Sequence, residues 1–595
     1  MQDSDTNAAV WRSLCGLHKT LVMLALTAAP AQADPAADFH ALLDEVWEYQ
    51  LVENPLFASY LGDRRYNDRW PDRSIDAVER RHRDTQAFLR RLYAIDRSAL
   101  SDGDELNYEL FRRELQNDVD RFDFNGWLMP FSHRGGVQTL DDRTRTIPLV
   151  TVADYDDWLE RLATIDTFIE QTIALAERGR RNGVVPPAVL MQRVPDQIAT
   201  QLVDDAGQSP FFAVFADLPA SIPPEQRDRL QNTARTTIED TVLPAYRRLH
   251  RYFVRTYLPA CRDSIGLSSL PNGAEWYEFL ARDFTTTSMS PDEIHRLGLE
   301  EVRRIRDDMQ AIIDEVGFDG DFAAFLDFLR SDPQFYYEDA DELYEAYLAT
   351  SKRIDPELVR LFGKLPRMPY GVKPIPAATA PDTTTAYYTG PAADGSRAGI
   401  YWVNLYRPEV RPKYEIEVLT VHEAMPGHHL QIALQQELED LPMFRRFSGF
   451  TAFVEGWGLY SESLGHELGL YRDPYSRFGA LTYEMWRAVR LVVDTGIHYK
   501  GWTREQAIDF FRANAAKTEH DIVNEIDRYI GNPGQALAYK IGQLRMLELR
   551  RNAETALGER FDVRAFHDEL LGAGALPLDV LQQRMNAWLT EQLQL

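Results

Sequence analysis

The segment VHEAMPGHHLQ, residues 421–431, holds three of the chain's thirteen histidines within eight residues, beside a glutamate. Zinc hydrolases commonly use two histidines on one helix, with a glutamate after the first histidine as general base. Their usual spacing is His-Glu-x-x-His, but here His428 follows His422 by six positions and His429 by seven. The cluster predicts a metal centre with an unusual backbone; a polar helix end with chance histidines is the plainer alternative.

A regular helix suits neither histidine as a partner of His422. A residue six positions on is rotated by about 240°, and one seven positions on lies about 10.5 Å along the axis. Pro426 lacks the N–H that a helix would donate to the carbonyl of His422, and the glycine after it tolerates unusual backbone angles. We expect a bulge or break over 424–427 that absorbs two residues and returns His428 to the ligand position. His429 would then point elsewhere, although the departure from the usual spacing leaves it open as the second ligand.

A third ligand is expected downstream, in FVEGWGLYSE at residues 453–462. Glu455 stands among apolar residues, where an unpaired carboxylate is costly to bury and a metal ion would neutralise its charge. The alternative is a carboxylate paired with a buried arginine or a helix start. Glu462 follows seven residues later on the same helical face, where it could hold a histidine ligand in place.

The run HEAMPGHHLQ, followed by EGWGLYSE, resembles a bacterial family of exported proteins described as a domain of unknown function and grouped with the gluzincin metallopeptidases. The resemblance extends from about Asp34 to the end of the chain. VEGWGLYSE is also similar to the NEGFAxYxE segment of gluzincin aminopeptidases, whose first glutamate is the third zinc ligand, which implies that role for Glu455. Gly427-His428 resembles the Gly-His ending of the HExGH motif of helical oligopeptidases, with two residues inserted, which favours His428 over His429. The aminopeptidase GxMEN segment is not visible, so aminopeptidase specificity is not implied.

These residues predict an exported zinc-dependent peptidase, with His422, His428 and Glu455 as ligands. Zinc would polarise the peptide carbonyl and acidify its bound water. Glu423 follows His422 directly and on a helix points about 100° away from it, so it can take the proton of that water and pass it to the leaving amine. The alternative is an exported helical protein that holds a metal with four ligands and hydrolyses nothing. A helical scaffold without metal is a more distant one.

Other polar residues are candidates for stabilising the developing oxyanion. One polar stripe at i+3 and i+4 steps runs along an otherwise apolar helix: Arg487, Arg490, Asp494 and His498. A solvated stripe is the plainer interpretation; the functional one puts His498 and an arginine over the cleft. Tyr529 and Tyr539 are similar candidates, although tyrosines are common in helical cores. We take His498 and Tyr539 as the catalytic candidates beside Glu423.

Outside this region the apolar residues recur mostly at helical spacing. Ser290 with Glu293, and Thr503 with Gln506, mark helix starts by the capping-box pattern. Residues 366–408 differ, because prolines, glycines and a threonine run surround β-like pieces.

The expected fold is mainly α, with two helical lobes around a cleft and a small sheet beside the metal-binding helix, a gluzincin-like arrangement as the resemblance implies. The expected units are a helical N-terminal lobe at 34–365, a small sheet with loops at 366–408, and a helical catalytic lobe with the zinc site at 409–595. The β-like pieces lie at 386–388 and 399–405. The second piece would accept an extended peptide as an added strand, as the gluzincin resemblance implies.

Residues 1–33 have the features of a signal peptide. An apolar run, Leu21–Ala29, follows a weakly basic start, and Ala31-Gln32-Ala33 fits the small-x-small cleavage pattern. The run is too short to span a bilayer, and Cys15 precedes it, which does not favour a lipid anchor. We expect an exported protein, periplasmic or secreted, without stable membrane insertion; an uncleaved N-terminal helix is the alternative.

The charge composition argues against nucleic acid and anionic membranes as binding partners. Acidic residues outnumber basic ones by 92 to 65, a formal net charge of −27, and such a surface repels nucleic acid and anionic membranes. Peptides remain as the expected substrates. Without residues 1–33 the chain has a single cysteine, Cys261. One cysteine excludes an intramolecular disulfide and a zinc site built from several cysteines. The sequence does not indicate the oligomeric state.

Overall fold

The computed structural model describes residues 34–145, 147–377 and 380–594. The predicted signal peptide, residues 1–33, lies outside the described residues. Within them the chain folds mainly into helices with one small sheet, which confirms the predicted fold class. Both predicted capping boxes are present, at Ser290 with Glu293 and at Thr503 with Gln506.

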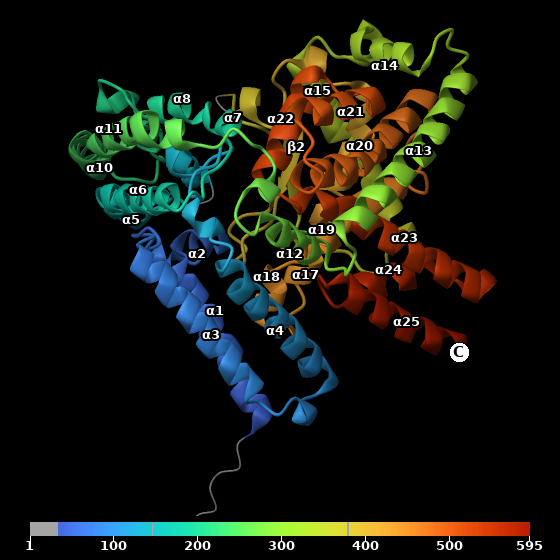
Figure 1. Ribbon diagram of the computed structural model, residues 1–595, viewed down its shortest axis with the longest axis horizontal. Helices are drawn as coiled ribbons and strands as arrows, with labels where there is room; N and C mark the ends of the chain where they lie inside the picture. Colours follow the sequence, from blue (N-terminus) through green and yellow to red (C-terminus); the bar gives the residue numbers. More distant parts are fainter. Residues whose placement is uncertain (1–33, 146, 378–379, 595) are drawn as a thin grey trace, which may run out of the picture.

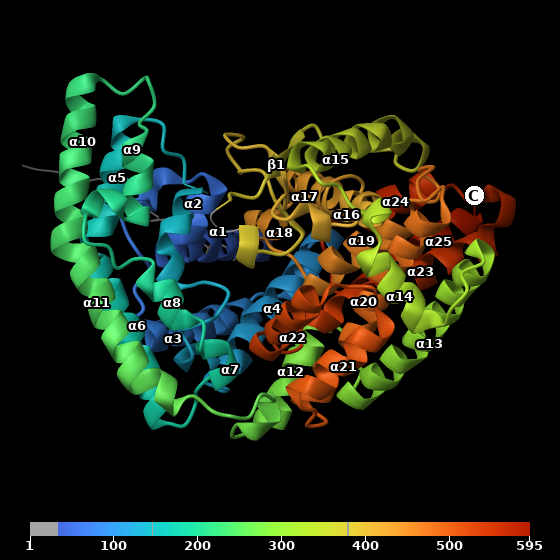
Figure 2. The ribbon, with the colours of Figure 1, turned by 90° about the horizontal axis from the view of Figure 1, so that it is seen from above.

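Helices α1 to α11 build the N-terminal part of the molecule. Helices α1, α3 and α4 pack side by side (Figure 1), and α10 and α11 follow each other along one flank (Figure 2). These helices are α1 (Pro35–Glu53), α2 (Pro55–Leu61), α3 (Ile75–Tyr93), α4 (Asp102–Phe122), α5 (Val152–Ala163), α6 (Ile165–Arg181), α7 (Ala188–Met191), α8 (Val194–Ala199), α9 (Ala213–Ala216), α10 (Pro224–Thr237) and α11 (Leu243–Tyr252).

The next helices lie with the C-terminal part of the chain, on the right of Figure 2. They are α12 (Gly273–Thr285), α13 (Pro291–Val316), α14 (Phe322–Ser331) and α15 (Ala340–Ile354). Helix α13 packs along α20 (Pro474–His498), and Gly298 permits the close approach, because a Cβ there would lie 2.7 Å from the Cβ of Leu491. The expected lobe boundary at residue 365 therefore divides helices that pack together.

The small sheet contacts α15 with one strand and α16 (Ile416–Glu423), the helix that carries His422, with another. It contains β1 (Tyr370–Pro374), β2 (Ala386–Thr389) and β3 (Gly399–Val403), in the order β1-β3-β2. Strand β3 pairs in parallel with β1 and antiparallel with β2. The sequence predicted β2 and β3 but not β1, whose glycine and proline are atypical of strands.

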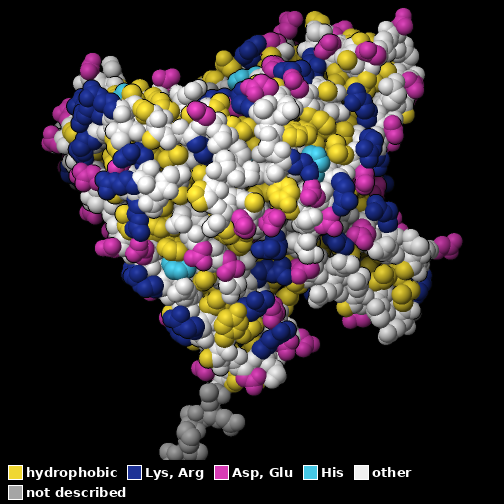
Figure 3. All heavy atoms as spheres, viewed as in Figure 1, with side chains coloured by type: hydrophobic (Ala, Val, Ile, Leu, Met, Phe, Trp, Pro, Cys, Tyr) yellow, Lys and Arg dark blue, Asp and Glu magenta, His cyan; other side chains and the backbone are white. Residues whose placement is uncertain are grey.

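The remaining helices complete the C-terminal part. They are α16 (Ile416–Glu423), α17 (His428–Gln436), α18 (Met443–Phe447), α19 (Thr451–Ser463), α21 (Arg504–Asn514), α22 (Glu519–Gly531), α23 (Ala538–Leu557), α24 (Val563–Leu571) and α25 (Leu578–Gln594). Of these, α16, α19, α21, α22 and α23 contact α20. Every residue of α20 from Met485 to His498 is buried. One hydrophobic core extends through the described residues from Phe39 to Trp588, whereas acidic and basic side chains are interspersed over the face in Figure 3. Because α20 is interior, its polar stripe is not a solvated one.

Candidate metal centre

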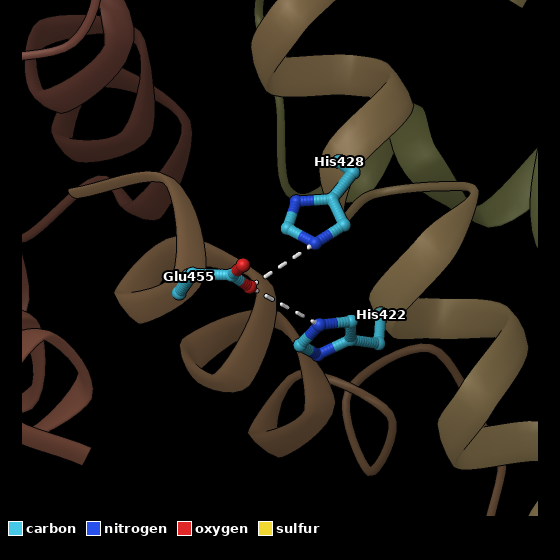
Figure 4. A group of neighbouring side chains, drawn as sticks. All are labelled: His422, His428 and Glu455. Carbon is cyan, nitrogen blue, oxygen red and sulfur yellow. Dashed lines mark ion pairs between the residues drawn. The ribbon is translucent and has the colours of Figure 1, made fainter. Parts of the chain in front are cut away.

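His422, His428 and Glu455 converge on one point (Figure 4). They come from the last turn of α16, the first residue of α17 and the first half of α19. Oε2 of Glu455 lies 3.8 Å from Nε2 of His422 and 3.4 Å from Nε2 of His428. Within the described residues this is the group of three side chains whose donor atoms approach closely enough to share one metal ion.

A break between two helices brings His428 to this point. Helix α16 ends at Glu423 and α17 begins at His428, with Ala424 and Gly427 at the non-helical ψ angles of −111° and −127°. The predicted break over 424–427 is therefore confirmed. A Cβ on Gly427 would lie 1.9 Å from the carbonyl oxygen of His422, so the turn requires glycine there.

The segment EGWGLYSE of α19 supports both sides of the break. The indole Nε1 of Trp457 donates hydrogen bonds to the carbonyls of Pro426, at 2.9 Å, and Gly427, at 3.2 Å. Gly458 makes room for the imidazole of His422, because a Cβ at this glycine would lie 2.7 Å from ring atom Cε1. The turn and the histidine ring are thus held by the same helix that carries Glu455.

Glu462 fixes the orientation of His422. Its carboxylate Oε1 lies 2.8 Å from Nδ1 of that ring, so Nδ1–H donates and Nε2 is turned toward Glu455. Arg487 of α20 lies 3.3 Å from the same carboxylate oxygen. A carboxylate behind a histidine is the usual device by which metal sites hold a ligand ring, as the sequence predicted for Glu462.

The charges of the cluster are coupled. Burial disfavours the charged form of His422, but the nearby carboxylates of Glu455 and Glu462 outweigh it and raise the pKa of this histidine to about 9. Burial also acts to raise the pKa of Glu455, but the two neighbouring histidines hold that pKa well below its usual range. The carboxylate of Glu455 is therefore ionised and favours a proton on the neighbouring histidine. A divalent cation bound between these side chains could take the place of that proton.

The donor set fits zinc. A tetrahedral zinc ion with bonds of about 2.0–2.2 Å separates its ligand atoms by about 3.3–3.6 Å. The distances of 3.4 and 3.8 Å from Glu455 to the two histidines are close to these values and longer than ordinary N–H···O hydrogen bonds. Three protein donors also leave one of four positions open.

His429 points away from this cluster. Its Nε2–H donates to the carbonyl of Met368 at 3.0 Å, and its Nδ1 accepts from the hydroxyl of Tyr388 at 2.8 Å. Burial lowers the pKa of His429 to about 4, so the ring is neutral and both nitrogens are occupied. Adjacent histidines thus have different surroundings, as the predicted break requires.

The cluster lies in a cavity of about 240 Å³ where the sheet, the C-terminal helices and a loop of the N-terminal part meet. Glu423 and Tyr539 line this cavity together with the three clustered residues. Of the polar stripe of α20, Arg487 and Arg490 also line it. Several other residues of the cavity were not predicted from the sequence: Arg134, Tyr388, Trp486, Glu525 and Arg528. Glu525 and Arg528 stand at i, i+3 spacing and could have been noticed, whereas no local pattern marks Arg134.

His498 lies outside the cavity, so its predicted role at the oxyanion is wrong. The backbone N–H of Leu267 donates to its Nδ1 at 3.1 Å, and its Nε2–H donates to the carbonyl of Tyr529 at 2.9 Å. Asp494 is likewise buried and accepts a hydrogen bond from the hydroxyl of Tyr277 at 2.6 Å. Both nitrogens of the histidine are occupied by segments distant in sequence, which helical spacing cannot reveal.

Tyr529 does not line the cavity itself, but its hydroxyl contacts three residues that do. Its hydroxyl accepts hydrogen bonds from Trp486 and Arg490 and donates one to Glu525 at 2.8 Å. Of the two tyrosine candidates, only Tyr539 lines the cavity within the part of the chain that the structure describes.

The expectation for the strand at 399–405 is also wrong. Strand β3 is central and pairs on both edges, with β1 and β2, so it has no free edge for a peptide. Strand β2 is an edge strand, and its residues Ala386 to Tyr388 line the cavity. The neighbouring strand therefore offers the edge that the sequence assigned to β3.

Fold and site together define a mainly helical protein with a His–Glu cluster in an internal cavity. The chain matches the family "Bacterial protein of unknown function (DUF885)" over residues 55–585, and it belongs to that family. No curated protein matches it. Within the described residues, no helix has the length and apolarity needed to cross a membrane.

Two solved structures share the fold. A crystal structure described as that of a "putative lipoprotein" from Colwellia psychrerythraea is 30% identical, with a TM-score of 0.87, and the match covers 93% of this chain and 100% of that one. A structure described as a "putative lipoprotein of unknown function" from Shewanella oneidensis is 18% identical, with a TM-score of 0.71 and the same coverage.

Proposed function

We propose that the protein is an exported zinc-dependent peptidase. The observation that carries the proposal is the convergence of His422, His428 and Glu455 in a cavity that Glu423 also lines. Three protein donors and one open position are typical of catalytic rather than structural zinc sites. The similarity of EGWGLYSE to the gluzincin segment supports the choice of metal, and the lipoprotein descriptions of the two structural relatives support export.

Each residue around the centre has a chemical role in this proposal. A zinc ion held by the three donors would polarise the scissile carbonyl and acidify water. A carboxylate oxygen of Glu423 accepts the proton of the attacking water and donates it to the nitrogen of the leaving amine. Its position directly after His422, at the end of α16, supports this role because it lines the same cavity without being one of the clustered donors.

Tyr539 is the proposed donor to the oxyanion. Burial raises the pKa of this phenol above its ordinary value, so the hydroxyl keeps its proton and can donate a hydrogen bond to an oxygen that gains charge. Arg490 stacks over the tyrosine ring, with 4.3 Å from Cζ to the ring centroid. The cation limits the freedom of the ring, which keeps the donor in place.

The free edge of β2 is the proposed docking line for the peptide backbone. Ala386, Tyr387 and Tyr388 line the cavity, and their strand pairs on one side only within the described sheet. An extended substrate can add to such an edge through main-chain hydrogen bonds, which bind peptides with little dependence on side chains.

The test combines metal analysis with peptide digestion. The protein without residues 1–33, purified without added metal, should contain one zinc per chain and should cleave members of a mixed peptide library. Glu423→Gln keeps the shape but removes the base, so it should retain zinc and lose about 10²–10⁴-fold in rate. Zinc that is absent and not restored by adding the metal would refute the centre. Zinc retained without any cleavage would favour the alternative, a metal-binding protein that hydrolyses nothing.

A further inference from the structure

Two arginines pair with one carboxylate in the cavity, and a third arginine lines the same cavity. The Oε2 atom of Glu525 lies 3.1 Å from Nη2 of Arg490 and 3.0 Å from Nη2 of Arg528, and it accepts the hydroxyl of Tyr529 at 2.8 Å. Arg134, from the loop after α4, lines the same cavity, and the charges of Glu525, Arg528 and Arg490 all act on it. Glu525 therefore pairs with two guanidinium groups, and the guanidinium of Arg134 adds a further positive charge to this part of the cavity.

Two of these arginines have unused hydrogen-bond donors. Arg134 is exposed, and within residues 34–145, 147–377 and 380–594 no hydrogen bond or salt bridge joins its guanidinium to another side chain, so its donors face solvent and are available to a ligand. The side chain of Arg490 is only 4% exposed, and its Nη1 atom is buried without a hydrogen-bond partner. A buried donor without an acceptor is costly, and a guanidinium presents its donors in a fork that matches a carboxylate.

This basic group and the metal centre lie in the same cavity. Tyr539 lines that cavity together with the metal cluster, and the Cζ atom of Arg490 lies 4.3 Å from the centroid of the tyrosine ring. The cavity of about 240 Å³ is small, below the roughly 300–1,000 Å³ of pockets for drug-sized ligands, which suits the end of a peptide better than a long segment.

The cavity also has an open side. A larger cavity of about 720 Å³ adjoins it and shares Arg134, Trp486 and Glu525 as lining residues. Arg134 therefore stands at the junction, where it can meet a substrate that reaches the metal centre. The chain as a whole carries a net charge of −27, so the attraction of an anion to this cavity would come from the free donors of Arg134 and Arg490 and not from the general surface charge.

We propose that Arg134 and Arg490 form a subsite for a carboxylate of the peptide substrate, in the cavity that also holds the metal centre. The proposal rests on the proposed function for the reaction itself and adds the substrate class. A C-terminal carboxylate and an acidic side chain share this chemistry. With the first, the protein trims peptides near a free C-terminus; with the second, it cleaves beside Asp or Glu.

The test uses one peptide library in three forms with the zinc-loaded protein. The forms are peptides with free C-termini, the same peptides with C-terminal amides, and amides in which Asn and Gln replace Asp and Glu. Cleavage rates measured by mass spectrometry should fall about 10- to 100-fold from the first to the third form, as expected for the loss of a charged hydrogen bond. A fall on amidation identifies the C-terminus as the source, and a fall at the acid-to-amide side-chain exchange identifies the side chain.

Matched variants assign the effect to the subsite. Arg134→Gln, on a loop and without side-chain partners, should fold normally and lose the preference for carboxylates, while Arg134→Lys should keep part of it. Arg251→Gln changes an exposed arginine of α11 outside the cavity and should keep the full preference. Equal rates on all three forms, or an unchanged preference in Arg134→Gln, would overturn the subsite.

A binding measurement separates this proposal from the proposed function. The Glu423→Gln protein should bind the free-acid peptides more tightly than the fully amidated form in calorimetry, and Arg134→Gln in the same background should abolish the difference. If no peptide is cleaved by the wild-type protein but this difference is present, the subsite stands and the peptidase proposal fails. If peptides are cleaved and the difference is absent, the reverse holds.

Discussion

The histidines of the cavity and the histidines of the interior differ in the partners of their ring nitrogens. His422 and His428 both turn Nε2 toward the carboxylate of Glu455. His429 and His498 instead use both nitrogens, mostly on backbone groups. All four side chains are buried, so burial alone does not distinguish them. A histidine can serve as a metal ligand only where the fold leaves a nitrogen without another partner and brings a second donor beside it.

The largest effect is expected when the two adjacent histidines are replaced by alanine one at a time. His428→Ala removes one of the three converging donors and should lower zinc affinity more than a hundredfold, beyond the 10- to 100-fold typical of residues behind a ligand. His429→Ala removes contacts to Tyr388 and Met368 and should change zinc affinity little. Titration against a chelator of known affinity measures both. The opposite order would identify His429 as the ligand.

A smaller effect is expected from the residue behind His422. Glu462→Gln keeps a hydrogen-bond acceptor for Nδ1 of His422. It removes the negative charge of the carboxylate that contacts His422 and Arg487. Zinc affinity should fall about 10- to 100-fold with the fold intact by circular dichroism. Glu439→Gln, at a side chain 77% exposed, is the control. An unchanged affinity in Glu462→Gln would mean that the orientation of His422 does not depend on this carboxylate.

The smallest effect is expected from an interior histidine, His498. It concerns the pH dependence of the free energy of unfolding and not metal binding. Burial lowers the pKa of His498 to about 4, although its bond to the carbonyl of Tyr529 opposes the shift. Between pH 6.5 and 4 the unfolded chain takes up a proton at this residue and the folded chain does not, so stability is present above this range and is lost as the pH falls. The loss from this residue is on the order of 3 kcal/mol.

His498→Gln tests this contribution. The variant should be less stable at pH 7, because it loses a backbone partner, but its free energy of unfolding should fall less steeply on acidification. Urea unfolding at pH 7, 6 and 5 measures the slope. His520→Gln, at an exposed position of α22, should keep the wild-type slope; a His498→Gln slope equal to that of the wild type would contradict the assignment.

Several features of the centre could be predicted from the sequence because their causes are local. A proline lacks an N–H wherever it stands, so a helix through Pro426 has to break, and the break over 424–427 follows. Glu455 and Glu462 are seven residues apart on one helix and therefore share a face. The structure brings both to the histidines of the centre, as that spacing allows.

Other assignments failed because their causes lie between distant segments. Arg490 and His498 belong to one helical stripe, yet the first lines the cavity and the second bonds to Leu267 and Tyr529. Likewise, two β-like pieces were predicted, but only the pairing order decides which has a free edge. Periodicity along a chain identifies a common face and does not say what packs against it.

By itself, the sequence determined the helical class, the break before His428 and the acidic residues of α19, since backbone geometry and helical spacing are properties of neighbouring residues. Only the tertiary structure decided that Tyr539 rather than His498 reaches the cavity, that β2 provides its open edge, and that Arg134 joins it from the N-terminal part. These outcomes depend on contacts between residues hundreds of positions apart, and no local pattern encodes them.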